Sequence, residues 1–166
     1  MGSLELKWGV MIGAANMVWL YLSYYLGMHE RGLVMIQVMT LISVLISVIG
    51  YLLALRALAK KFPEIEYLEG IRSGAIIAGV VALFAAVAQV GYFKLVNPGF
   101  TDQMVELTRS YYLESGLSEN EAGRFAEGAK KTFGMVSYMI QSALGAVIIG
   151  MISTAIMMLF LRRRAA

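Results

Sequence analysis

The chain contains 166 residues, of which 59% are hydrophobic and only 15% are charged, and its mean hydropathy is +0.70. A typical soluble domain carries about a quarter charged residues, so this composition excludes an ordinary soluble domain and indicates a protein that lies largely in lipid. The net charge is +3, and the absence of cysteine excludes disulfide and thiol chemistry. No soluble basic patch with interleaved aromatic residues supports nucleic-acid binding.

Four apolar stretches follow one another, at residues 8–26, 32–55, 74–92 and 134–161, and none of them contains Asp, Glu, Lys, Arg or His. A helix needs about 20 apolar residues to cross a bilayer, and these stretches are too long and too continuously apolar for barrel strands. We therefore predict an all-α integral membrane protein, a bundle of four transmembrane helices formed by one domain over residues 1–166. The first span is expected to be retained rather than cleaved, because the second follows almost at once.

The connections between the predicted spans carry recognisable stop signals. Residues 27–32 are too few for anything but a tight turn between the first two spans. The second helix is predicted to run to Lys61, because Pro63 ends it. The third span is predicted to leave the lipid at Tyr92, in the aromatic belt of the membrane surface, and to be broken by Asn-Pro-Gly at residues 97–99.

Residues 101–133 are the longest water-facing segment, and we predict that they form an extracytoplasmic amphipathic helical hairpin between spans three and four. Thr101 is the expected N-cap of the first helix and Gly116 its end, while Ser-Glu-Asn-Glu at residues 118–121 matches a capping box that starts the second helix. The second arm could continue into span four. A candidate surface for a partner or for lipid is formed by the apolar residues Met104, Leu107, Tyr111 and Phe125.

Basic residues are distributed unevenly over this predicted topology. If the N-terminus is cytoplasmic, eight Lys and Arg residues lie on the cytoplasmic side and six on the opposite side. The triplet Arg162-Arg163-Arg164 directly follows the last span, and cytoplasmic segments of membrane proteins are enriched in Lys and Arg. We therefore predict a multi-pass protein with both termini in the cytoplasm.

Four amide side chains lie within the predicted spans, namely Asn16, Gln37, Gln89 and Gln141. Because span direction alternates, the three glutamines all fall in the outer half of the bilayer and could form one polar layer. One interpretation is hydrogen bonding between helices, worth about 0.6 to 2 kcal/mol per bond, and the other is a polar site for a substrate or ion. We favour the first, because intramembrane transport sites usually enlist an ionisable group and the predicted spans contain none.

The remaining chemistry-bearing residues indicate no site. The methionines include the i,i+4 pairs Met35/Met39 and Met135/Met139, but flexible methionine fills gaps in cores as readily as it binds copper. His29 is the single histidine and lies in the short first loop, so we interpret it as an interfacial polar residue rather than a catalytic base. No catalytic residue, metal site or cofactor is predicted.

Three segments carry a resemblance that covers nearly the whole chain. They are the early GVMIGAANM, the stretch YFKLVNPGF that ends the third span ahead of an acidic helical insertion, and the closing GMISTAIMMLFLRRR. With these segments the chain resembles the domain of unknown function 4199 family, which are short four-span bacterial membrane proteins. The resemblance implies a location in the bacterial inner (cytoplasmic) membrane, and it implies no activity or catalytic residues.

The function predicted from these observations is non-enzymatic. We expect a structural or accessory protein that lies in the lipid bilayer and packs against itself, as a homo-oligomer, or against another membrane protein. The alternative is a small oligomeric transporter or channel with a polar layer at Gln37, Gln89 and Gln141. Enzyme chemistry is disfavoured, because the predicted spans contain no acid and base, nucleophile or metal cluster.

Overall fold

The structure is a computed structural model that describes residues 2–161, and within them the chain forms six α-helices and two short helical turns. The all-α prediction is therefore confirmed. The elements in chain order are α1 (Gly2–Tyr25), the 3-10 turn η1 (Met28–Glu30), α2 (Leu33–Lys61), α3 (Tyr67–Gly91), the π turn η2 (Tyr92–Val96), α4 (Phe100–Glu114), α5 (Glu119–Thr132) and α6 (Met135–Leu161).

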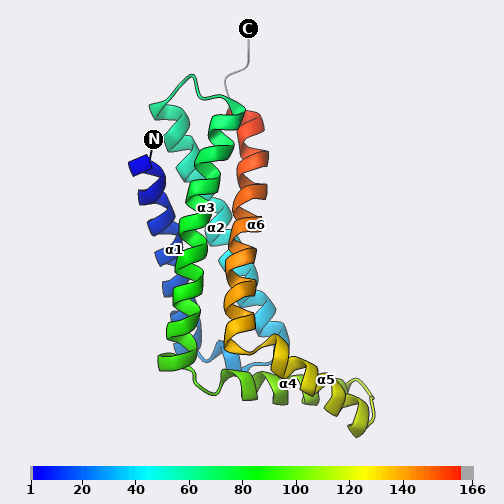
Figure 1. Cartoon of the computed structure of the whole chain (residues 1–166). Coiled ribbons are helices and arrows are strands. Elements are labelled where there is room, and N and C mark those ends of the chain that lie inside the picture. The colour runs from blue at the N-terminus through cyan, green and yellow to red at the C-terminus, as the bar shows by residue number, and fades with distance from the viewer. Residues whose placement is uncertain (1, 162–166) are drawn as a thin grey trace.

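Helices α1, α2, α3 and α6 run side by side and make up a four-helix bundle (Figure 1). Helix α3 packs against α1 and α6, and α2 packs against the same two helices, so the order around the bundle is α1, α3, α6, α2. The start of α1, the connection from α2 to α3 and the end of α6 lie at one end, called here the termini end (Figure 1). Helices α4 and α5 lie across the opposite end, called here the hairpin end.

Two clusters of buried side chains hold the bundle together. The larger cluster is apolar, occupies the half of the bundle toward the termini end, and includes Tyr51, Leu55, Leu58, Ile77 and Met158. The second, the aromatic cluster, lies at the hairpin end and consists of Tyr92, Phe93, Phe100 and Met104 with aromatic neighbours from α1 and α6. The aromatic cluster joins the end of α3 to the start of α4, so it attaches the hairpin to the bundle.

Glycine allows α1 to lie close against α3. A Cβ atom added at Gly9 would lie 2.7 Å from the Cβ of Val80, and one added at Gly13 would lie 2.6 Å from the Cβ of Phe84. Such distances are too short for real side chains, so larger residues at these positions would push the two helices apart. Small residues at the contacts between membrane helices allow this close approach, since lipid supplies no hydrophobic drive for association.

Most of the predicted local signals are confirmed. Helix α2 ends at Lys61, and Gly116 ends α4 with a φ of 89°. The capping box at the start of α5 is present: the Ser118 hydroxyl accepts from the Glu121 N–H, and the Ser118 N–H donates to the Glu121 carboxylate at 3.0 Å. The Ser118 hydroxyl also donates to the Glu121 carboxylate at 2.6 Å, and this bond, followed by the one from the Ser118 N–H, lowers the pKa of the Glu121 carboxyl because both favour its charged form.

The predicted N-cap at Thr101 is wrong. Helix α4 begins at Phe100, so its N-cap position is Gly99, two residues before Thr101 and at the end of the turn at residues 97–99. The Thr101 hydroxyl instead donates to the Phe133 carbonyl at 3.0 Å and so joins the start of the hairpin to its end. The second arm is not continuous with the following span, because α5 ends at Thr132 and a new helix begins at Met135.

Three of the helical segments are long and apolar enough to cross a membrane, namely Leu33–Lys61, Tyr67–Val96 and Met135–Leu161. Helix α1 is 24 residues long and is not among them. Its sequence carries Glu5, Lys7 and Asn16, which lower its hydropathy. The structure thus contains three candidate spans and a fourth, less apolar helix packed beside α2 and α3.

Candidate functional site: a cavity inside the helix bundle

A cavity of about 550 Å³ lies between the four long helices and is called here the bundle cavity. All four helices contribute to its lining, and η1, η2 and α4 close it at the hairpin end through His29, Tyr92 and Phe100. Ligand sites in proteins are typically concave spaces of about 300–1,000 Å³, mostly apolar, with a few placed polar groups. The bundle cavity has the size and the mixed lining of such a site.

Polar side chains on the cavity wall join neighbouring helices in pairs. The Asn16 amide of α1 donates to the Ser47 hydroxyl of α2 at 3.1 Å, and also to the Ile12 carbonyl at 3.1 Å. The indole N–H of Trp19 donates to the Met39 carbonyl of α2 at 3.0 Å. These bonds satisfy the polar groups that connect α1 to α2.

Gln89 is different, because its amide is only half satisfied. Its side chain is 7% exposed, and Nε2 donates to the Ser142 hydroxyl of α6 at 3.0 Å. The buried Oε1 has no hydrogen-bond partner among the described residues. A buried polar atom without a partner destabilises a protein by about 1–3 kcal/mol. Such an atom in a folded protein therefore indicates a bonding partner outside the chain, such as a ligand or a water molecule.

His29 closes the hairpin end of the cavity and is 3% exposed. Its ring lies among those of Tyr24, Tyr92 and Phe100, with centroid separations of 5.9, 5.2 and 6.0 Å, and its Nδ1 has no hydrogen-bond partner among residues 2–161. Burial lowers the pKa of His29 from its ordinary 6.5 to about 4. A hydrogen bond with the Ser23 backbone raises this pKa, but by less than burial lowers it. The imidazole is therefore uncharged at neutral pH.

The cavity is more polar at one end than at the other. Toward the hairpin end its wall carries the imidazole of His29, the amides of Gln89 and Gln141 and several hydroxyl groups. Toward the termini end the wall carries apolar residues such as Val81, Ala146 and Ile149 together with Asn16 and Ser47, whose polar groups bond to each other. None of the lining residues is Asp, Glu, Lys or Arg. An elongated guest would therefore meet uncharged hydrogen-bonding groups at one end and apolar side chains at the other.

The four amides predicted as a polar layer have different surroundings. Asn16, Gln89 and Gln141 line the bundle cavity, whereas Gln37 lines a second cavity of about 440 Å³ beside it. Gln37 and Gln141 are exposed, and Gln141 donates to the Thr132 carbonyl at 2.9 Å and to the Ser137 hydroxyl at 3.0 Å. Among the described residues, no hydrogen bond joins two of the four amides; their partners are hydroxyl groups and backbone carbonyls.

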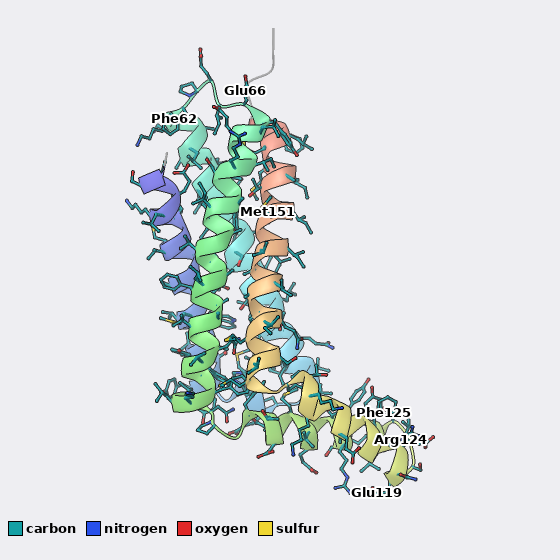
Figure 2. The ribbon with its side chains drawn as sticks, in the orientation of Figure 1. Phe62, Glu66, Glu119, Arg124, Phe125 and Met151 are labelled. Carbon is teal, nitrogen blue, oxygen red and sulfur yellow. The ribbon has the colours of Figure 1, made fainter. Side chains whose placement is uncertain are left out.

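The four residues predicted to form a surface for a partner or for lipid on the hairpin differ in their burial. Met104 is buried in the aromatic cluster and Leu107 is partly buried against it, so these two residues attach the hairpin to the bundle. Tyr111 and Phe125 are half-exposed, and Figure 2 shows Phe125 near the far end of the hairpin, away from the bundle. The Phe125 ring stacks on Tyr112 with centroids 4.2 Å apart.

Sequence reasoning missed two buried ionisable residues. His29, interpreted above as interfacial, is buried because α4 and η2 fold over it, and Gln103 of α4 donates to its carbonyl at 3.2 Å. Glu5 is fully buried: Oε1 accepts from the Ser73 hydroxyl at 2.8 Å, and Oε2 has no partner among the described residues. The signal for Glu5 was its place three residues before the first apolar stretch, where one more helical turn carries it into the bundle.

In the described part of the chain, no three His, Cys, Asp or Glu side chains come together in a group that could hold a metal ion. The bundle and its cavity define the class of protein: an all-α helix bundle with three candidate membrane spans, which suggests a multi-pass membrane protein in contact with lipid.

Comparison with known proteins then identifies the family. The model of a protein family described as Protein of unknown function (DUF4199) matches residues 7–163, so the chain belongs to that family. The resemblance noted from the sequence is therefore confirmed. No curated protein and no solved structure was found to match the chain.

Proposed function

We propose that this protein is a non-enzymatic accessory protein of the bacterial inner membrane that holds a small lipid-soluble molecule in the bundle cavity. The observation that carries this proposal is the half-satisfied Gln89 amide on the wall of a cavity of about 550 Å³. A small molecule bound in the cavity would contact the apolar wall and would give the Gln89 amide oxygen a hydrogen-bond partner.

The proposed topology has four spans with both termini in the cytoplasm and the α4–α5 hairpin on the outer surface. Helix α1 lies alongside the three candidate spans, and its 24 residues correspond to about 36 Å of helix, enough for a hydrocarbon core of about 30 Å. Two of its polar residues have partners inside the bundle, since Asn16 bonds to Ser47 and Glu5 bonds to Ser73, while Lys7 is exposed. Such pairing lets a less apolar helix occupy the membrane.

Binding rather than catalysis or transport is proposed from the chemistry of the wall. The lining combines amides, hydroxyl groups and one uncharged imidazole with apolar side chains, and it holds no Asp, Glu, Lys or Arg. Intramembrane ion and proton pathways usually enlist ionisable groups. The transporter alternative also needs Gln37, Gln89 and Gln141 in one layer, whereas Gln37 lines the neighbouring cavity.

A matched pair of glycine substitutions tests the proposal. Gly145 lines the cavity with open space beside it, and Gly79 of α3 also has open space but does not line the cavity. Gly145→Phe should fill the cavity, and Gly79→Phe should leave it empty; both add helix propensity at a mid-helix glycine. The full chain in lipid nanodiscs would be photolabelled with an undecanol that carries a mid-chain diazirine, and labelled residues would be mapped by mass spectrometry.

We expect saturable labelling of cavity residues in the wild-type protein and in Gly79→Phe, and loss of that labelling in Gly145→Phe. Labelling of lipid-facing residues should be equal in all three proteins, which controls for probe dissolved in the bilayer. If excess unlabelled undecanol displaces no cavity labelling from the wild-type protein, the proposed function is wrong.

A second candidate function is contact with another copy of the chain or with another membrane protein through the hairpin. The observation that favours it is the half-exposure of Tyr111 on α4 and Phe125 on α5, in a hairpin that extends beyond the bundle (Figure 2). The segment from residue 102 to residue 131 holds six acidic and four basic residues, whereas helices that bind anionic lipid are usually rich in Lys and Arg. Protein contact therefore suits this surface better than lipid binding alone.

A further inference from the structure

The distribution of polar and apolar groups on the cavity wall restricts the class of molecule that can bind there. We infer that the guest is an uncharged amphipathic molecule with a hydroxyl or N–H head group, bound with its head at Gln89 and His29 and its tail toward the termini end. This inference rests on the proposed function and adds the class of ligand and its orientation.

The head group must donate a hydrogen bond. Gln89 uses its N–H donor on Ser142, so the free atom of the amide is the acceptor Oε1. Oε1 has almost no accessible surface, so binding requires the amide to turn toward the cavity. A hydroxyl or N–H group then satisfies this acceptor, whereas a ketone or an ester cannot. A hydroxyl group also accepts, so it can bond to whichever nitrogen of the uncharged His29 ring carries the proton.

The head group must also be uncharged. The cavity wall holds no Asp, Glu, Lys or Arg that would pair with an ion, and His29 is uncharged at neutral pH. A carboxylate or ammonium group in this uncharged cavity would lack a counter-charge, and burial of an unpaired charge is far more unfavourable than burial of a hydroxyl group. Fatty-acid anions and cationic amines are therefore excluded by the wall chemistry.

The tail direction follows from the apolar end of the cavity. On the side away from His29 the wall consists of Val81, Ala146 and Ile149 and of the Asn16–Ser47 pair, whose polar groups bond to each other. An access route to the polar end is offered by the second cavity, which shares Ile36, Thr40 and Tyr138 with the first. These shared residues come from α2 and α6, so a molecule from the leaflet beside the hairpin end can reach the head-group site between those two helices.

The experiment compares three competitors that differ only in the head group. Undecanol, undecane and undecanoate, the last at pH 9 to ensure its ionisation, would be titrated at equal mole fraction in the bilayer against the photoreactive undecanol. Undecanol should displace the probe at the lowest concentration. Undecane, which lacks the hydrogen bonds, should be weaker by roughly three- to thirty-fold, and undecanoate should be at least as weak as undecane.

Three variants assign the head-group preference to Gln89. Gln89→Leu should remove most of the advantage of undecanol over undecane and leave only the contribution of His29. Ser142→Ala removes the helix-to-helix bond but keeps the amide, so it should retain the preference for undecanol; this separates the role in binding from a role in folding. Asn120→Leu, an exposed amide on α5 that lines neither cavity, is the control and should behave as the wild-type protein.

The outcomes separate the inference from the function beneath it. If none of the three competitors displaces the probe, the cavity is not a guest site and the proposed function fails as well. If undecane or undecanoate competes as strongly as undecanol in the wild-type protein, the cavity binds guests but the inferred head-group chemistry is wrong. If Gln89→Leu does not fold, this comparison in the wild-type protein decides alone.

Discussion

His29 is the residue whose surroundings differ most from those expected for a loop histidine. It is 3% exposed, three aromatic rings surround it, and its Nδ1 lacks a hydrogen-bond partner in the described part of the chain. The aromatic cluster beside it joins α3 to α4. A charge on this imidazole would therefore act where the hairpin is attached to the bundle.

The pKa of His29 predicts that mild acid destabilises the fold. The unfolded side chain titrates at 6.5 and the folded one at about 4, so between these values the unfolded state binds more protons. Stability is complete above pH 6.5 and falls as the pH is lowered toward 4. Between pH 7 and pH 5 the free energy of unfolding should fall by about 2 kcal/mol, measured by thermal unfolding in nanodiscs.

The control for this prediction is His29→Phe, which keeps an aromatic ring but cannot take up a proton. Its unfolding midpoint should change much less between pH 7 and pH 5. The lowered pKa of Glu121 affects stability only below the ordinary carboxyl value of 4.5, so it does not contribute in this range. Equal acid sensitivity of the two proteins would contradict the assignment to His29.

At the scale of elements, the α4–α5 hairpin has two parts with different roles. Near the bundle, Met104 attaches it to the aromatic cluster, and the bond from Thr101 to Phe133 joins the start of the hairpin to its end. At its far end the two arms are joined by the stack of Phe125 on Tyr112 and by an ion pair between Arg109 and Glu119, both exposed. An exposed ion pair contributes little, so the stacked rings hold this end together.

The hairpin gives a prediction about partners. Phe125→Ser should lower the free energy of unfolding by about 1 kcal/mol through loss of the stacked pair, and Tyr111→Ser should lower it less, because it removes only the edge-to-face contact with Tyr112. If the far end contacts a partner, both substitutions should reduce chemical crosslinking in native membranes. Tyr25→Ser, an exposed aromatic residue on α1, is the control. Unchanged crosslinking and stability in both hairpin variants would show that this end is neither an interface nor part of the folded core.

For the whole molecule, the proposed topology depends on whether α1 crosses the membrane. The other three long helices are apolar enough by composition, and α1 packs against two of them. If α1 spans, its first residues lie on the same side as the connection from α2 to α3. If it does not, they lie on the side of the hairpin.

Cysteine labelling decides between these arrangements, because the chain contains no cysteine of its own. An impermeant thiol reagent should label Asn120→Cys in intact cells and should label Lys60→Cys and Ser3→Cys only after the membrane is permeabilised. Labelling of Ser3→Cys together with Asn120→Cys would leave three spans. Labelling of Lys60→Cys but not Asn120→Cys in intact cells would invert the orientation.

The sequence by itself determined the helices and most of their ends, because these depend on interactions between residues close together in the chain. The length of the apolar stretches, the stop at Pro63 and the capping box at Ser118 are all readable within a few residues. The predicted N-cap at Thr101 was wrong for a related reason: its hydroxyl bonds to Phe133, which is 32 residues away, and no local pattern reports that contact.

The tertiary structure alone decided which polar groups are buried and what they face. Gln89 and Gln141 look alike in sequence, yet Gln89 lies against α6 with a free oxygen, and Gln141 is exposed and satisfied beside α5. His29 became a cavity wall because η2 and α4 fold over η1, and Glu5 became buried because α1 begins early enough to reach Ser73. The cavity exists only through the packing of four helices that are far apart in the chain, and that packing is not encoded in the periodicity of any one of them.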